Sequence, residues 1–221
     1  MADVRPFRGV RYATTSIGSA LCPPYDVISP ELAKTLRRRP ENAVFLELPQ
    51  GDGPKRYERA AGAWRRWVVD GTLARDARPA FYAIEERYRL DGRARTRRGF
   101  LAALGATAKA ARSIIPHERT LAKPKADRLK MLDAVGVNIS PIFGVFADPK
   151  GAARRALASA MRGRPDAAGR SHAGIDYRLW VADEPRVVAA IRKALAPRSI
   201  LIADGHHRYA VSREHHSRTG G

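Results

Sequence analysis

The fold of this chain is best predicted from one stretch, Ile200-Leu201-Ile202-Ala203-Asp204-Gly205-His206-His207-Arg208-Tyr209-Ala210. Its first four residues are apolar and predict a short buried strand. The Asp-Gly pair that follows is a turn signal, and a helix is expected to begin near Tyr209. A strand, a tight turn and a helix start together direct unpaired backbone N–H groups at an anion. The stretch therefore predicts a phosphate-binding turn.

The side chains of this turn suit the same ligand, because imidazole and guanidinium groups donate hydrogen bonds and carry positive charge. The residues predicted to bind phosphate or a nucleotide here are Asp204, Gly205, His206, His207 and Arg208. Asp204 has two alternative uses, as a ligand for Mg²⁺ and as an ordinary helix cap.

Two alternatives to a phosphate site stay open. The histidines could be solvated side chains beyond a helix cap, or they could ligate a metal together with His215 and His216. Adjacent histidines point in different directions, and no cysteine or second spaced pair of ligands completes a metal site. Phosphate is therefore favoured over a resident metal.

Length and composition indicate a folded protein. The 221 residues suffice for one large domain or two small ones, and 44% of them are hydrophobic. No apolar run approaches the roughly 20 residues of a membrane helix, and the N-terminus lacks the apolar centre of a signal peptide. The single cysteine, Cys22, excludes an internal disulfide and is predicted to be an idle thiol. We expect a cytoplasmic location and no membrane partner.

The charge is strongly basic, with 41 Lys and Arg against 22 Asp and Glu and a net charge of +19. Such a chain attracts polyanions, from nucleotides to nucleic acid. The basic residues are dispersed, which favours general anion affinity over a dedicated DNA-reading face. A basic nucleic-acid-binding protein stays the alternative function, and the oligomeric state is not predicted.

Hydrophobic periodicity and turn signals predict a mixture of helices and strands. Helices are expected from Pro30, over 55–70, from Lys123 to near Gly136, over 151–161 and over 185–195. Strands are expected over 44–48, 81–90, 95–104, 139–146, 177–181 and 200–204, with a polar loop over 163–174. The strands over 81–90 and 95–104 are expected to form a hairpin around Asp91-Gly92.

This irregular order favours the α+β class: a mixed sheet with hairpins and flanking helices rather than a doubly wound sheet. Residues 1–221 are expected to form one incomplete α+β unit without an internal boundary. Only a turn or two of helix is expected after the phosphate-binding turn.

Several segments, taken in order, resemble DUF1015, a family of uncharacterised bacterial and archaeal proteins. The segments are Pro24-Tyr25-Asp26-Val27-Ile28-Ser29, Pro40-Glu41-Asn42 with Leu46-Glu47-Leu48-Pro49, Thr96-Arg97-Arg98-Gly99-Phe100, Pro116-His117-Glu118-Arg119-Thr120 with Lys125 and Asp127-Arg128-Leu129, Ser140-Pro141-Ile142-Phe143, and Ala203 to Tyr209. Members of the family usually continue well past the last motif. The resemblance therefore implies an N-terminal portion, or a truncated copy, of a longer family domain.

The turn itself resembles the phosphate-binding turn of the ParB/sulfiredoxin superfamily, which includes free-serine kinases. In that superfamily a strand–turn–helix of this type holds nucleotide phosphates. Sulfiredoxins carry a reactive cysteine inside the turn, where this chain has His206, and Cys22 is remote in sequence. ParB-type partitioning proteins add a helix-turn-helix module, of which the sequence shows no sign. The resemblance thus implies a small-molecule kinase that uses ATP or ADP with Mg²⁺ on a serine-like hydroxy amino acid.

Phosphoryl transfer needs neutralised charge, positioned groups and usually one carboxylate that orients the attacking hydroxyl. Glu118 is the candidate general base and His117 a proton relay or phosphate donor, although a loop-to-helix capping segment explains these residues equally well. Asp26 is either a second catalytic acid or a turn residue. Lys125 and Arg128 are predicted to add phosphate contacts, unless Arg128 merely pairs with a neighbour on a helix surface. A third reading is an inactive, truncated member that only binds an anion.

Overall fold

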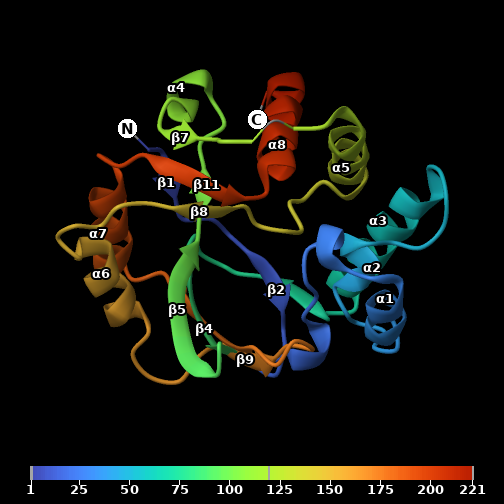
Figure 1. The fold of residues 1–221 in the computed structure, drawn as a ribbon, viewed down its shortest axis with the longest axis horizontal. Coiled ribbons are helices and arrows are strands. Elements are labelled where there is room, and N and C mark those ends of the chain that lie inside the picture. The colour runs from blue at the N-terminus through green and yellow to red at the C-terminus, as the bar shows by residue number, and fades with distance from the viewer. Residues whose placement is uncertain (1, 119, 221) are drawn as a thin grey trace.

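The structure is a computed structural model that describes residues 2–118 and 120–220. It has the α+β class predicted from the sequence (Figure 1). Arg119, part of the motif around Glu118, lies outside the described residues. Among the described residues, no helix is both long enough and apolar enough to cross a bilayer.

The elements alternate irregularly along the chain. The helices are α1 (Pro30–Leu36), α2 (Val44–Glu47), α3 (Lys55–Val69), α4 (Ala108–Ala111), α5 (Ala122–Val135), α6 (Ala152–Ala160), α7 (Pro185–Leu195) and α8 (His206–Thr219), with 3-10 turns η1 (Gly18–Ala20) and η2 (Tyr25–Val27). The strands are β1 (Val4–Arg5), β2 (Val10–Tyr12), β3 (Leu73–Arg75), β4 (Phe81–Leu90), β5 (Arg93–Leu101), β6 (Ala103–Leu104), β7 (Ile114–Ile115), β8 (Phe143–Val145), β9 (Ala167–Arg170), β10 (Asp176–Ala182) and β11 (Ile200–Asp204).

The largest sheet is antiparallel, with the strand order β5-β4-β10-β9. Strands β4 and β5 form the predicted hairpin. Its turn residues Asp91 and Gly92 have φ of 49° and 73°, the positive values that a two-residue type I′ turn requires. A second sheet has the order β7-β11-β8, in which β7 is parallel and β8 antiparallel to β11. β1 pairs with β6, and β2 pairs with β3.

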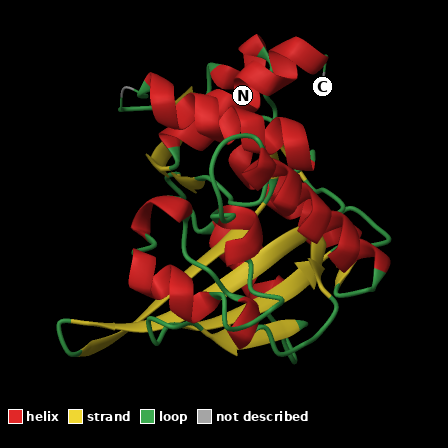
Figure 2. Ribbon diagram, turned by 90° about the vertical axis from the view of Figure 1, so that its right-hand side faces the viewer, coloured by secondary structure: helices red, strands yellow, loops and turns green. Residues whose placement is uncertain are grey.

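The main core lies between the large sheet, the helices α6 and α7, and β11. Figure 2 shows the long strands with helices packed around them. Phe81 of β4 and Ile191 of α7 are fully buried there. β11 places Ile200 and Ile202 in this core and turns Leu201 outward, as the two-residue period of a strand requires. This burial anchors the strand that leads into the predicted phosphate turn.

A second group of buried side chains surrounds α3. Its residue Trp67 packs with Leu73 and with side chains of α2, and Ala60 packs with Met131 of α5. The helix predicted over 55–70 is therefore confirmed, and its aromatic residues Tyr57, Trp64 and Trp67 pack into this group. α5 also contacts α8. α8 thus follows a strand of the first core and packs on a helix of the second.

The strand predicted over 44–48 is wrong, because residues 44–47 form the short helix α2. The cause is the preceding residue Asn42, which is buried. Its Oδ1 accepts from the Val44 N–H at 2.9 Å, and its Nδ2 donates to the carbonyls of Ser19 and Leu21. A side-chain acceptor at this position favours a helical turn over an extended one.

Two other local expectations are wrong. The polar loop predicted over 163–174 contains strand β9, whose small residues allow close packing: a β-carbon at Gly169 would collide with the backbone of Gly18 in η1. α8 begins at His206 and extends to Thr219, well beyond a turn or two. Tertiary contact supports its second half, since Asp133 of α5 pairs with His215 and Arg218.

Candidate functional site

The predicted phosphate turn has the expected strand–turn–helix geometry. β11 ends at Asp204, Gly205 has φ of +89°, and α8 starts at His206. A left-handed φ is costly for any residue with a β-carbon, which explains the glycine. In the described part of the chain no side chain caps α8, so its first N–H groups meet no side-chain acceptor. An uncapped N-terminus of a 14-residue helix favours an anion there.

Arg208 is held directly over this turn. One terminal nitrogen lies 2.6 Å from Asp204 Oδ2, and the other donates to the Pro141 carbonyl. A β-carbon placed on Gly205 would lie only 3.0 Å from Arg208 Nε. The guanidinium therefore covers the glycine and contributes a fixed positive charge beside the helix N-terminus.

The two histidines hold a different segment against α8. His206, only 4% exposed, places Nδ1 3.1 Å from Glu118 Oε2, and its Nε2 accepts from the His117 N–H at 3.4 Å. His207 Nε2 accepts from the Leu121 N–H at 3.0 Å. Because Nε2 is an acceptor in both rings, the proton of each neutral ring is assigned to Nδ1. The side chains thus join residues 117–121 to the helix start.

His117 and Glu118 complete what we call the histidine cluster, with His206 and His207. The rings of His117 and His206 meet edge to face, with centroids 4.6 Å apart, and His117 Nε2 lies 3.9 Å from Glu118 Oε1. Glu118 itself is 62% exposed. A carboxylate open to solvent and oriented by a buried imidazole has the arrangement of a candidate general base.

Arg128 belongs to α5, the helix that packs against α8. Its guanidinium donates to Asp127 Oδ2 at 2.6 and 2.9 Å and to the Glu47 carbonyl at 3.1 Å. It also lies 4.2 Å above the ring of Tyr25. Burial lowers the pKa of Arg128 from its ordinary value, opposed by the charges of Glu47 and Asp26 among others. Asp26, in η2, is therefore close to this cation.

Lys125 points elsewhere. Its Nζ lies 3.6 Å from Glu214 Oε2, in the second half of α8. His215, named in the metal alternative, pairs with Asp133 at 2.9 Å at the same end of the helix. Among the residues that the structure describes, no three His, Cys, Asp or Glu side chains gather as a metal site.

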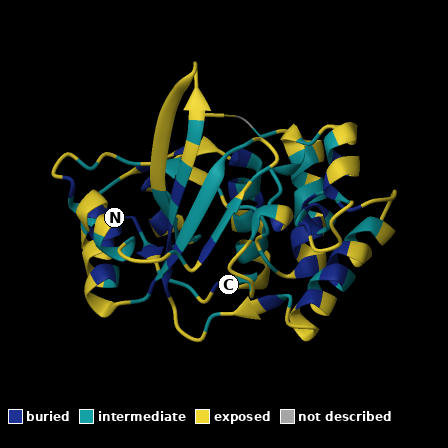
Figure 3. Cartoon of the chain, turned by 90° about the horizontal axis from the view of Figure 1, so that it is seen from below, coloured by how far each residue is buried: buried dark blue, intermediate teal, exposed yellow. Residues whose placement is uncertain are grey.

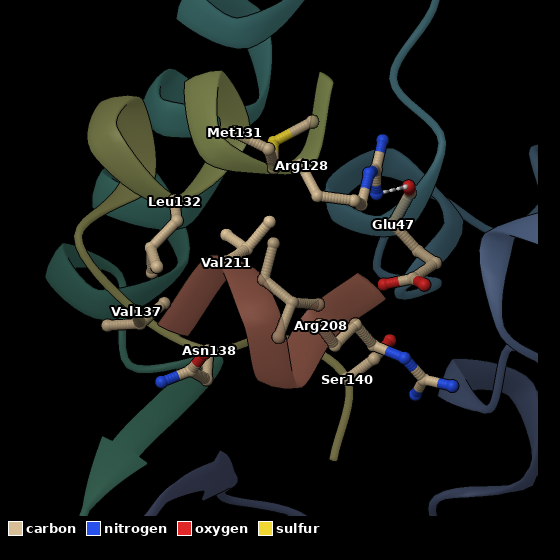
Figure 4. Close-up of a pocket in the computed structure, with 10 residues that line it drawn as sticks. Glu47, Arg128, Met131, Leu132, Val137, Asn138, Ser140, Arg208 and Val211 are labelled. Carbon is tan, nitrogen blue, oxygen red and sulfur yellow. Dashed lines mark hydrogen bonds between the residues drawn. The ribbon is translucent and has the colours of Figure 1, made fainter. Parts of the chain in front are cut away.

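A small hollow connects Arg128 with Arg208 (Figure 4). Its empty space of about 390 Å³ includes open solvent, and the centres of water-sized molecules can occupy only about 40 Å³ of it. We call it the α5–α8 hollow; its lining residues are Glu47, Arg128, Met131, Leu132, Val137, Asn138, Ile139, Ser140, Arg208 and Val211. Its floor is apolar, and its polar groups come from four separate segments of the chain.

Sequence reasoning missed Glu47, which is 4% exposed. Its Oε1 accepts from the Tyr25 N–H at 2.9 Å. The signal that could have found it is a carboxylate inside the apolar run 44–48, because an acidic residue is rarely buried without a purpose. The incorrect strand prediction hid this signal, since alternation would have turned Glu47 away from its apolar neighbours.

Comparison with known proteins agrees with the segments quoted above. A family model described as "Protein of unknown function (DUF1015)" matches residues 4–220. Neither the curated proteins nor the solved structures contain a significant match to the chain.

Proposed function

Because the chain belongs to the DUF1015 family, which is described only as being of unknown function, we propose an activity from the site itself. The activity is nucleotide-dependent transfer of a phosphoryl group to or from a small hydroxy amino acid such as serine. The observation that carries the proposal is the uncapped N-terminus of α8, which starts at a left-handed glycine beneath the guanidinium of Arg208.

Phosphate binding follows from these groups. The first backbone N–H groups of α8 and the helix dipole attract an anion, and Arg208 adds a charged donor that is already positioned. ATP or ADP is the proposed donor. Asp204 lies on the exposed side of the Arg208 pair and is the carboxylate available to a Mg²⁺ that the nucleotide brings, since Mg²⁺ commonly takes one or two carboxylates together with phosphate oxygens.

The histidine cluster supports the proton transfer. In the proposed direction of synthesis, Glu118 accepts the proton of the substrate hydroxyl as that oxygen attacks the terminal phosphorus. His206, donating from Nδ1, orients the carboxylate, and His117 stands next to it as a relay. In the reverse direction the same carboxylate returns the proton to the leaving hydroxyl.

A thermal-shift experiment tests nucleotide binding. Millimolar ATP or ADP with Mg²⁺ is expected to raise the melting temperature of the wild type, and Arg208→Ala is expected to abolish the shift. Arg213→Ala is the matched control, because Arg213 is an exposed arginine of the same helix. Phosphoserine formed from ATP and serine, or ATP formed from ADP and phosphoserine, is the activity to measure. An unchanged melting curve for every nucleotide overturns the proposal.

One observation favours nucleic-acid binding as a second candidate. The β4–β5 hairpin projects from the rest of the chain and is largely exposed (Figure 3). Its exposed arginines are Arg87, Arg89, Arg93, Arg95, Arg97 and Arg98. Binding of RNA or DNA that weakens steeply with salt, and that is lost on Arg93→Ser with Arg95→Ser but kept in Arg208→Ala, would support this function over the first.

A further inference from the structure

The carboxylate of Glu47 is buried in an unusual way. It is 4% exposed, and its one hydrogen bond among the described residues is the one from the Tyr25 N–H. Within the same residues no basic side chain lies within 4 Å of it. Arg128 reaches the backbone carbonyl of Glu47 and not its carboxylate. A buried carboxylate with no cation in direct contact is costly, so its retention needs a reason.

The two nearby arginines are already engaged. Arg128 is held by Asp127 and Tyr25, and Arg208 by Asp204 and the carbonyl of Pro141. Glu47 nevertheless forms part of the wall of the α5–α8 hollow, where Figure 4 shows its carboxylate between the two guanidinium groups in this view. Among the described residues that line the hollow Glu47 is the only acidic one, so a small cation that binds there would pair with its carboxylate.

We propose that the α5–α8 hollow binds the α-ammonium group of an amino acid on the carboxylate of Glu47. This ammonium site rests on the function proposed above, and it assigns the substrate class as a small α-amino acid rather than a hydroxy acid or a sugar. An ammonium group would place a positive charge and further hydrogen-bond donors in direct contact with the Glu47 carboxylate. The hydroxyl of Ser140 and the amide of Asn138 offer further polar contacts on the same wall.

The position of the hollow relates this group to the phosphate turn. Arg208 belongs to both, because its guanidinium covers Gly205 while its side chain lines the hollow. Arg208 thus lies between two binding sites: the proposed ammonium site at Glu47, and the start of α8, where an anion would bind. The apolar floor of Met131, Leu132 and Val211 offers no polar partner to a long polar side chain that lies on it. The hollow therefore selects a short amino acid.

The test compares ligands with and without the amino group. Calorimetry of the wild type is expected to show L-serine or O-phospho-L-serine binding at least tenfold more tightly than 3-hydroxypropionate, which is serine without its ammonium. Glu47→Gln is expected to weaken the binding of both amino acids at least tenfold and to remove their advantage over 3-hydroxypropionate. The amide keeps an oxygen for the Tyr25 N–H, and Glu58→Gln, on the exposed surface of α3, is the matched control.

Nucleotide binding separates this proposal from the preceding one. If Glu47→Gln keeps the rise in melting temperature caused by Mg²⁺-ATP but no longer binds serine, the ammonium site stands. If wild type binds nucleotide and Glu47→Gln still prefers serine tenfold over 3-hydroxypropionate, or if wild type shows no such preference, the ammonium site is overturned while phosphoryl transfer stays open. If serine binding depends on Glu47 but no nucleotide binds, the ammonium site stands and phosphoryl transfer fails.

Discussion

The guanidinium of Arg208 lies so close over Gly205 that a β-carbon on the glycine would sit 3.0 Å from Arg208 Nε. The glycine is therefore required twice: once for its φ of +89° and once for the space that the arginine occupies.

Gly205→Ala is expected to destabilise the fold by about 1 kcal/mol or more through backbone strain, and to displace Arg208. Nucleotide affinity should fall at least tenfold. Gly136→Ala separates the two effects, because Gly136 also has positive φ, at 76°, but a β-carbon there would meet none of the other described residues within 4 Å. Denaturant unfolding and a nucleotide titration of both variants measure this. Equal nucleotide affinity in the two variants would contradict the role of Arg208.

The histidines are expected to control the segment that carries Glu118. Removing the acceptor in His207→Ala frees the Leu121 N–H, and His206→Ala frees that of His117. Hydrogen exchange at each of these amides should accelerate at least tenfold in the corresponding variant. His216→Ala, later in the same helix, should leave both amides unchanged. Unaltered protection in the two test variants would show that the histidines do not hold the segment.

Glu85 is expected to make stability sensitive to acid. Burial alone would raise its pKa, but hydrogen bonds from Arg98 and Arg87 outweigh burial and hold the pKa below the ordinary 4.5. A lowered folded-state pKa contributes stability above pH 4.5 that is lost as the pH falls through the folded value. Glu85→Gln should therefore cost roughly 1–3 kcal/mol at pH 7 and flatten the loss of stability below pH 4.5. Urea unfolding between pH 7 and pH 3 measures both; parallel profiles for variant and wild type would refute the assignment.

Cys22 is expected to be inert in the folded protein. Burial, followed by the charge of Glu47, raises the pKa of its thiol to about 12. Since the thiolate is the reactive form, alkylation at pH 8 should be at least a hundredfold slower in the native protein than in urea. Rapid labelling of the native thiol would show that burial does not keep Cys22 in its unreactive protonated form. The result also bears on the ParB/sulfiredoxin resemblance, because a reactive cysteine is what the sulfiredoxins require.

The sequence predicts well those elements whose signals lie within their own residues. The amphipathic period of α3, the Asp-Gly turn of the β4–β5 hairpin and the apolar run of β11 each specify their element with little help from distant residues. Elements that depend on tertiary contact were not predicted. α2 needs Asn42 and its partners, and β9 needs the close approach of Gly18.

The same division applies to the site. The turn at Gly205 was predicted because a strand, a glycine and a helix start are local signals. Glu47 was missed, because its meaning lies in burial next to α5 and α8, which are distant in sequence. Lys125 was named for its place in a motif, and the structure pairs it with Glu214. The roles assigned to Glu118, His117 and Asp26 stay predictions.

β11 and α8 are consecutive in the chain, and the helix joins two hydrophobic groups: its residue Tyr209 is buried in the core of β11, α6 and α7, and the helix also contacts α5, which packs on α3. An anion that binds at Gly205 therefore lies where these two hydrophobic groups meet. Enlarging or truncating a buried side chain of either group, such as Ile191 or Met131, should therefore change the affinity for that anion, although neither residue belongs to the phosphate turn.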